Sequence, residues 1–122
     1  MDLRTLSAIA VITGASVMAA TPRPAQATVP ASQVRAINLA RNTAVAENGG
    51  LSVYRPQPCM FQTSTGGGDC LQNNDSAGYT FRFLGGSPGW PENGSEATTE
   101  TEIQIAPDGR AVNNVIYNGS PR

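Results

Sequence analysis

The chain has no histidine and no lysine, and arginine supplies all eight of its basic side chains. Without histidine, Ser-His and Cys-His nucleophile pairs and histidine-ligated zinc are excluded, and without lysine Schiff-base chemistry is excluded. Carboxylates, tyrosines and the amine that cleavage before Thr28 would create remain as acids and bases. Thr28 precedes Val-Pro-Ala-Ser, which is typical of a flexible lead-in or a helix cap. The sequence therefore predicts that the protein is not an enzyme.

The chain also lacks an excess of charge of either sign. Its formal net charge is −1, and the region after residue 27 carries six arginines against eight acidic residues. A nucleic-acid site or a surface for anionic lipid needs a cluster of positive charge. Neither kind of partner is predicted.

Long apolar runs are missing except at the amino terminus. One arginine, Arg4, precedes an apolar run over residues 6–20, and Ala25-Gln26-Ala27 has the small-x-small form of a cleavage site. This layout is typical of a secretory signal peptide. The run is shorter and more polar than the roughly 20 apolar residues that cross a bilayer. We expect a signal peptide at 1–27, a single mature domain at 28–122 and a periplasmic or secreted location, with no membrane span after cleavage and a retained anchor as the alternative.

Only two cysteines are present, Cys59 and Cys70, with three consecutive glycines between them. A structural zinc site needs about four Cys or His ligands, and a thioredoxin-like pair is spaced C-x-x-C at a helix start. The glycines lack the Lys-Ser/Thr pair of a phosphate loop. In an exported protein the remaining interpretation is a disulfide, worth about 3 kcal/mol for so short a loop. Two free thiols are the alternative.

The stretch after Cys70 is rich in the oxygen-bearing side chains that bind calcium. An EF-hand loop that begins at Asn73 would place Ala77 and Leu84 at ligand positions, which fails the pattern. The Asn and Asp side chains there are better explained as turn formers, with an irregular calcium site as the alternative. No metal and no cofactor is predicted.

The sequence predicts one helix, over about residues 31–48. Pro30 suits the first turn, and Gly49 stands where a left-handed C-cap is expected. Apolar residues recur at helical spacing, and the polar residues between them are expected to face water. The expected apolar stripe is Val34, Ile37, Ala40 or Arg41, Ala44 and Val45, and the expected water-facing residues are Arg35, Asn38, Arg41 and Asn42.

Strand and turn signals follow from residue 51 onward. Strands are predicted over 51–55, 79–84, 98–105 and 111–118, the last two joined by a hairpin turn with Gly109 at positive φ. Alternation places Tyr79, Phe81, Phe83, Thr101, Ile103 and Ile105 in the core, and Thr80, Arg82, Leu84, Glu100, Glu102 and Gln104 on the other face, where Arg82 could pair with a glutamate. The predicted fold is α+β, with one N-terminal helix packed on a small antiparallel sheet that a disulfide cross-links.

The binding hypothesis centres on the loop at residues 85–94, which holds the single tryptophan. Trp90 stands between Gly89 and Pro91, and Glu92 and Asn93 follow. An exposed Trp90 would be an anchor for a protein or a stacking platform for a sugar ring. The other interpretation is that Trp90 folds back over one edge of the core.

We therefore expect an exported, non-enzymatic binding domain whose partner is a protein or a glycan, with Trp90, Glu92, Asn93 and Arg82 as candidate contact residues. One alternative is a carbohydrate-binding or envelope-binding module, which requires an exposed Trp90. The other is a hydrolase, which requires two carboxylates to converge at about 5–9 Å. Its candidate carboxylates are Glu96, Glu100 and Glu102.

Four segments resemble a family of small exported cyanobacterial proteins: "NGGLSVYRPQPCMF", "GGGDCL", "FRFLGGSPGW" and "PDGRAVNNVIYNGSPR". The resemblance covers residues 31–122 and implies a cyanobacterial periplasmic or extracellular setting. It implies no catalytic residues. The order of a helix, Asn-Gly-Gly and strands is also similar to small α+β modules of PepSY type, which are associated with inhibitory or chaperone-like binding.

Overall fold

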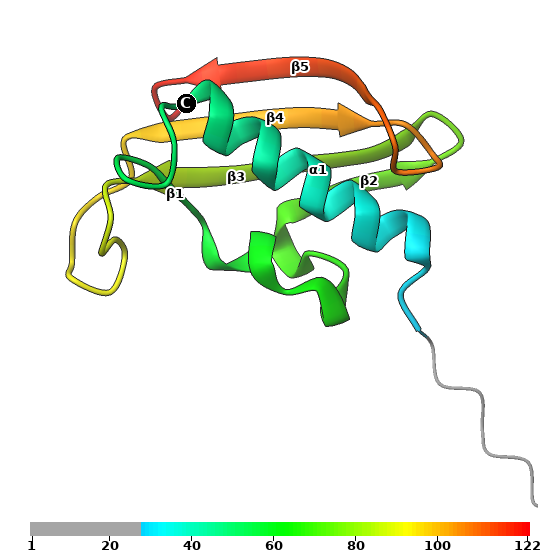
Figure 1. The fold of residues 1–122 in the computed structure, drawn as a ribbon, viewed down its shortest axis with the longest axis horizontal. Helices are drawn as coiled ribbons and strands as arrows, with labels where there is room; N and C mark the ends of the chain where they lie inside the picture. Colours follow the sequence, from blue (N-terminus) through cyan, green and yellow to red (C-terminus); the bar gives the residue numbers. More distant parts are fainter. Residues whose placement is uncertain (1–27) are drawn as a thin grey trace, which may run out of the picture.

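The computed structural model describes residues 28–122, so the predicted signal peptide at 1–27 lies outside the described residues. One helix, α1 (Ala31–Glu47), lies across one face of a five-stranded antiparallel sheet (Figure 1). The strands are β1 (Arg55–Pro56), β2 (Leu71–Asp75), β3 (Gly78–Gly86), β4 (Thr99–Ile105) and β5 (Val112–Gly119), and the short 3-10 helices between β1 and β2 are η1 (Pro58–Phe61), η2 (Thr63–Thr65) and η3 (Gly68–Cys70). The predicted α+β class is confirmed.

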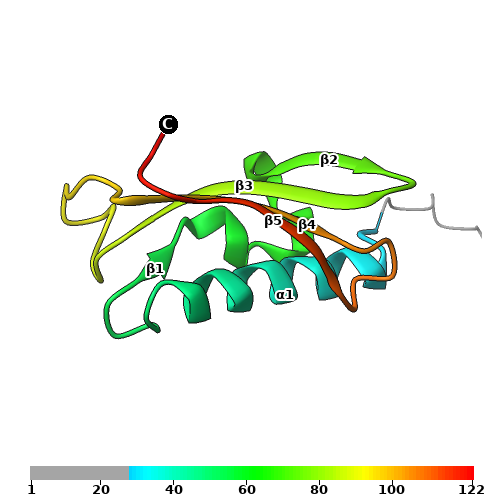
Figure 2. The same cartoon turned by 90° about the horizontal axis from the view of Figure 1, so that it is seen from above.

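The central strand of the sheet is β3. Strand β4 pairs along one side of it, while β1 and β2 pair with successive parts of the other side. Strand β5 pairs with β4 through the predicted hairpin and forms the outer edge. Figure 2 shows the sheet and α1 as two layers, with the carboxyl terminus on the side of the sheet away from the helix.

Helix α1 has the predicted start and a well-formed end. It begins directly after Pro30, and Gly49 has φ 100° just past the C-cap residue Asn48. The N–H of Gly50 donates to the carbonyl of Val45 at 2.9 Å, which is the 6→1 bond of a Schellman motif. The prediction of a helix over 31–48 is confirmed.

The helix packs closely because its buried residues are small. Ala36, Ala40 and Ala44 are at most 1% exposed, so the helix backbone can approach the sheet. Opposite them lie the large core side chains, as alternation predicted. Tyr79, Phe81, Phe83, Thr101, Ile103 and Ile105 are all buried.

One buried polar residue of α1 was not foreseen, and one expectation about α1 needs correction. Gln33 is buried although it is polar, because its side-chain amide donates to the carbonyl of Gly66 at 2.9 Å. Arg41 is half-buried rather than water-facing, because it donates to the carbonyl of Met60 and stacks on Phe61. Both residues tie the helix to the segment between β1 and β2.

That segment is cross-linked as predicted. A disulfide joins Cys59 in η1 to Cys70 at the end of η3, with 5.9 Å between their Cα atoms. Gly67, at φ 96°, passes so close to Phe81 that a Cβ would lie 3.2 Å from its ring. The glycine run therefore lets the cross-linked loop lie flat against the core.

The predicted strand at 51–55 is wrong. Residues 51–53 form a turn, and the N–H of Tyr54 donates to the carbonyl of Gly50, so only Arg55 and Pro56 pair with β3. Apolar alternation was present in this stretch, but Leu51 and Val53 are exposed.

Within residues 28–122 no helix is long and apolar enough to cross a bilayer.

Candidate functional site

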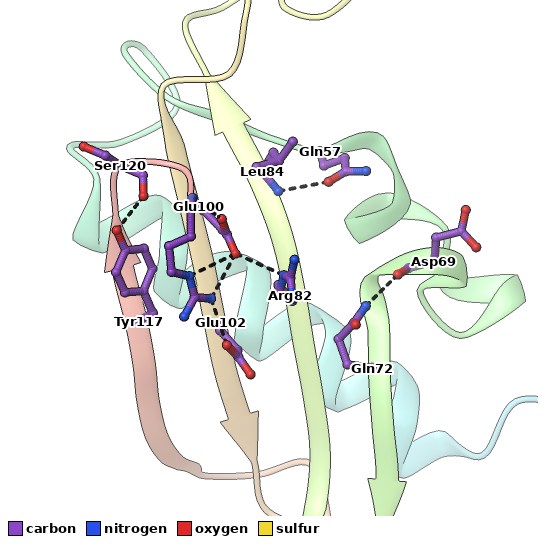
Figure 3. A network of polar contacts seen from close by, with 10 residues as sticks. Gln57, Asp69, Gln72, Arg82, Leu84, Glu100, Glu102, Tyr117 and Ser120 are labelled. Atoms are coloured by element: carbon purple, nitrogen blue, oxygen red, sulfur yellow. Dashed lines mark hydrogen bonds and ion pairs between the residues drawn. The ribbon is translucent and has the colours of Figure 1, made fainter.

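The face of the sheet away from α1 carries a buried carboxylate. Glu100, expected to face solvent, is only 3% exposed, which corrects that expectation. The Nε of Arg82 lies 3.0 Å from the Glu100 carboxylate, so the predicted ion pair between Arg82 and a glutamate is confirmed (Figure 3). Arg82 faces Glu102 in the strand register but pairs diagonally with Glu100, while a second arginine contacts both glutamates.

That second arginine is Arg122, which reaches back over β4. Its backbone N–H donates to Oε1 of Glu100 at 2.7 Å, and its Nη2 donates at 2.9 Å to both Oε2 of Glu100 and Oε1 of Glu102. Its Cζ lies 4.0 Å from the ring centroid of Tyr117. We call Glu100, Glu102 and Tyr117 the arginine clasp.

Arg122 and Arg82 keep Glu100 in its ionised form. The N–H of Arg122 is the main cause that lowers the pKa of Glu100, and the side chains of Arg122 and Arg82 lower it further against the opposing effect of burial. Hydrogen bonds to Glu102 and then to Glu100 raise the pKa of Arg122. The arrangement is a neutralised ion network, in which Glu100 is in the wrong state for a general acid.

The glutamates of the hydrolase alternative are therefore only partly brought together. Glu100 and Glu102 converge, but they converge on one arginine nitrogen, while Glu96 is exposed in the loop between β3 and β4. Among residues 28–122 there is also no group of three or more Cys, Asp or Glu side chains that could hold a metal ion.

A hollow of about 350 Å³ lies beside the clasp, beneath the chain that follows β5. It lies between Pro121 and Arg122 on one side and residues of β3, with Gln57, on the other. Its lining residues are Gln57, Arg82, Phe83, Leu84, Glu100, Pro121 and Arg122.

Trp90 is buried, so of the two interpretations of the loop the one with an exposed indole is wrong. Its exposed fraction is 9%, and its Nε1–H donates to the carbonyl of Arg55 at 2.6 Å. The ring lies on Gly86, where a Cβ would sit 2.9 Å from the indole Cγ. Trp90 folds back onto the sheet, as the second interpretation of the loop had it.

Beside Trp90 an open groove of about 360 Å³ remains. One wall is Trp90 and the other is Phe61, which is 52% exposed. The guanidinium of Arg41 lies 5.0 Å from the Phe61 ring and fixes its orientation. The residues that line this Phe61–Trp90 groove are Arg55, Pro56, Pro58, Phe61, Gly89, Trp90 and Glu92.

The four candidate contact residues are thus divided between two places. Trp90 and Glu92 line the groove, and Arg82 belongs to the ion network on the open sheet face. Asn93 shapes the loop, because its Oδ1 accepts the N–H of Ser95 at 2.8 Å. Sequence reasoning missed Phe61, although an aromatic residue two positions after a cysteine predicted to form a disulfide was a usable signal.

Comparison of the chain with models of protein families, with curated proteins and with solved structures finds no match. The function therefore has to be inferred from the groove and the clasp themselves.

Proposed function

We propose that this protein is an exported, non-enzymatic binding domain whose Phe61–Trp90 groove takes a short, uncharged, apolar peptide segment of a partner protein. The observation that supports the proposal is the exposed ring of Phe61, 52% accessible, opposite a tryptophan in one open groove. An apolar groove with a few polar groups at its rim is the usual form of a ligand site.

The composition of the groove favours a neutral ligand. Two prolines and two aromatic rings supply apolar walls, while Arg55 and Glu92 contribute one charge of each sign. Aromatic-lined grooves accept extended, proline-rich peptides because such peptides lose little conformational entropy when they bind.

The groove is also held rigidly before any ligand binds. The disulfide at Cys59 fixes η1, Arg41 stacks on Phe61, and the indole N–H of Trp90 is bonded to the carbonyl of Arg55. A preformed site loses less entropy on binding.

A glycan is the second candidate ligand, bound on Phe61, because the module that required an exposed Trp90 does not fit the buried indole. Sugar rings stack on an open aromatic face, and the groove offers Phe61 for this purpose. It is less favoured because the one tryptophan is 9% exposed and its N–H is already used.

Trp90 supplies the assay, since it is the single tryptophan and lines the groove. The titrants are a library of blocked peptides built from proline and leucine, and the neutral oligosaccharide cellohexaose. We expect saturable changes in Trp90 emission with library peptides. Phe61→Ser should weaken binding at least about tenfold, the effect of losing an anchor.

The matched control is Val53→Ser, because Val53 is 58% exposed and does not line the groove. It should leave peptide affinity unchanged. A saturable response to cellohexaose and to no peptide would replace the peptide proposal with the glycan module. Equal losses in the two variants, or no response to either titrant, would contradict a ligand site in the groove.

A further inference from the structure

The guanidinium of Arg122 is seated in the clasp as a bound ligand would be. Glu100 accepts two of its N–H groups, from Nη2 at 2.9 Å and from Nε at 3.2 Å, and Glu102 accepts a third contact at 2.9 Å. The Tyr117 ring covers the guanidinium at 4.0 Å. Carboxylates combined with an aromatic face match a planar guanidinium, whereas an ammonium group matches them poorly.

The receptor side of this contact is rigid. Glu100 and Glu102 stand two residues apart on β4, so they project from the same face of the sheet. Tyr117 is the register partner of Glu102 on β5, which brings its ring beside the two carboxylates (Figure 3). Strand pairing therefore places the three side chains on one face of the sheet, where Arg82 also holds Glu100.

The ligand side is a short exposed segment. Arg122 follows β5 through Ser120 and Pro121 only, and all three residues are exposed. The hollow of about 350 Å³ lies between this tail and the sheet. Apart from the guanidinium contacts, two bonds retain the tail: the backbone N–H of Arg122 donates to Glu100, and the hydroxyl of Tyr117 donates to the carbonyl of Ser120.

We infer that the clasp of Glu100, Glu102 and Tyr117 is a receptor for an arginine side chain, filled in cis by Arg122 and open to the arginine of a partner when the tail lifts. The exchange conserves the charge balance, since one guanidinium replaces another on the same carboxylates. It is independent of the Phe61–Trp90 groove, which shares no lining residue with the hollow.

The experiment empties the clasp and offers it a substitute. Arg122→Ala is titrated with the blocked tetrapeptide acetyl-Gly-Ser-Pro-Arg-amide, and binding is followed by the thermal midpoint and by amide NMR shifts on β4 and β5. We expect saturable binding in the variant and binding at least about fivefold weaker in the unchanged protein, because a tethered ligand competes at millimolar effective concentration.

Two controls separate a guanidinium receptor from general charge attraction. The same peptide with lysine in place of arginine should bind markedly more weakly to the variant. Addition of Glu102→Gln to Arg122→Ala should also weaken the arginine peptide, since it removes one ligand of the guanidinium. Equal binding of both peptides, or unchanged binding after Glu102→Gln, would overturn the inference.

If the Arg122→Ala variant does not fold, the receptor is tested with Arg122→Gln and with the unchanged protein. In the unchanged protein the Nε–H resonance of Arg122 is followed while the arginine peptide is added. Displacement shows as movement of that resonance toward its free position, with the lysine peptide inactive. No movement at high peptide concentration, together with no binding to Arg122→Gln, would refute the receptor.

Discussion

Replacement of Tyr54 by phenylalanine should stabilise this protein. Tyr54 is 3% exposed, and its ring lies against the backbone of Gly85 on β3. Among residues 28–122 its hydroxyl is the one buried side-chain polar atom without a hydrogen bond of normal geometry. Burial raises the pKa of Tyr54 and nearby Thr101 opposes that rise, but the Thr101 hydroxyl already donates to Asn118. A buried polar group that is left unpaired costs about 1–3 kcal/mol, and phenylalanine keeps the ring without that group.

The expected gain is about 1 kcal/mol, at the lower end of that range, because loss of the oxygen also leaves a small void. For a domain of this size, a gain of 1 kcal/mol corresponds to a rise in thermal midpoint of about 4–8 °C. Chemical denaturation followed by far-ultraviolet circular dichroism measures the free energy of unfolding directly.

The same substitution should change the alkaline limb of stability. Burial raises the pKa of Tyr54 to about 12, against about 10 in an unfolded chain. Between these values the unfolded chain loses the proton while the folded protein keeps it. Titration of Tyr54 therefore leaves the free energy of unfolding unchanged below pH 10 and lowers it as the pH rises toward 12. Tyr54→Phe should reduce this loss.

Tyr79→Phe is the matched control, because the hydroxyl of Tyr79 lies 2.6 Å from Oγ of Ser32. Loss of that hydrogen bond should destabilise the protein by about 1 kcal/mol. The two substitutions remove the same atom and are expected to act in opposite directions. If Tyr54→Phe proves as destabilising as Tyr79→Phe, the Tyr54 hydroxyl has a partner and the reasoning is refuted.

Three further predictions concern the clasp, the disulfide and one turn. Because the pKa of Glu100 is lowered, its contribution to stability is present above about pH 4.3, the unfolded value, and is lost as the pH falls. Glu100→Gln should remove this acid dependence from denaturation midpoints measured between pH 3 and 6, and an unchanged slope would contradict the ionised assignment. Reduction of Cys59–Cys70, or its double replacement by serine, should cost about 3 kcal/mol at neutral pH; a cost below 1 kcal/mol would show that the loop is ordered by packing alone. Gly109→Ala should cost more than 2 kcal/mol, because Gly109 has φ 75° and a Cβ would strike the carbonyl of Ser32. Gly94→Ala is its control, since Gly94 also has positive φ but nothing within 4 Å of a Cβ, and equal losses would place the whole effect in the backbone conformation.

Local sequence signals determined the elements of this fold. Alternation in β3 and β4, the Pro30 start and Gly49 end of α1, and the turn at Gly109 depend on residues within a few positions of one another. Such short-range preferences specify a helix or a strand wherever one face of that element packs against a core. The disulfide could also be predicted, because the chain has only two cysteines and they can pair only with each other.

The failed strand at 51–55 shows where local signals end. Its apolar alternation was sufficient for a strand, but the Schellman end of α1 continues into a turn that places Leu51 and Val53 outside the core. The sheet then has room for only Arg55 and Pro56 beside β3. A competing turn that starts at the preceding glycines decided the outcome.

The candidate sites depended on contacts between distant residues, and only the tertiary structure decided them. Glu100 has the alternation of a solvent-facing residue, and it is buried because Arg122, 22 positions away, folds back over it. Trp90 has the sequence setting of an exposed loop residue, and it is buried because the carbonyl of Arg55 and the bare backbone of Gly86 accept it. Amino-acid composition and residue spacing do not indicate which distant segments of the chain contact one another. The sequence by itself therefore determined the helix, the core strands and the cross-link, and three-dimensional packing determined which polar and aromatic groups remain accessible to a partner.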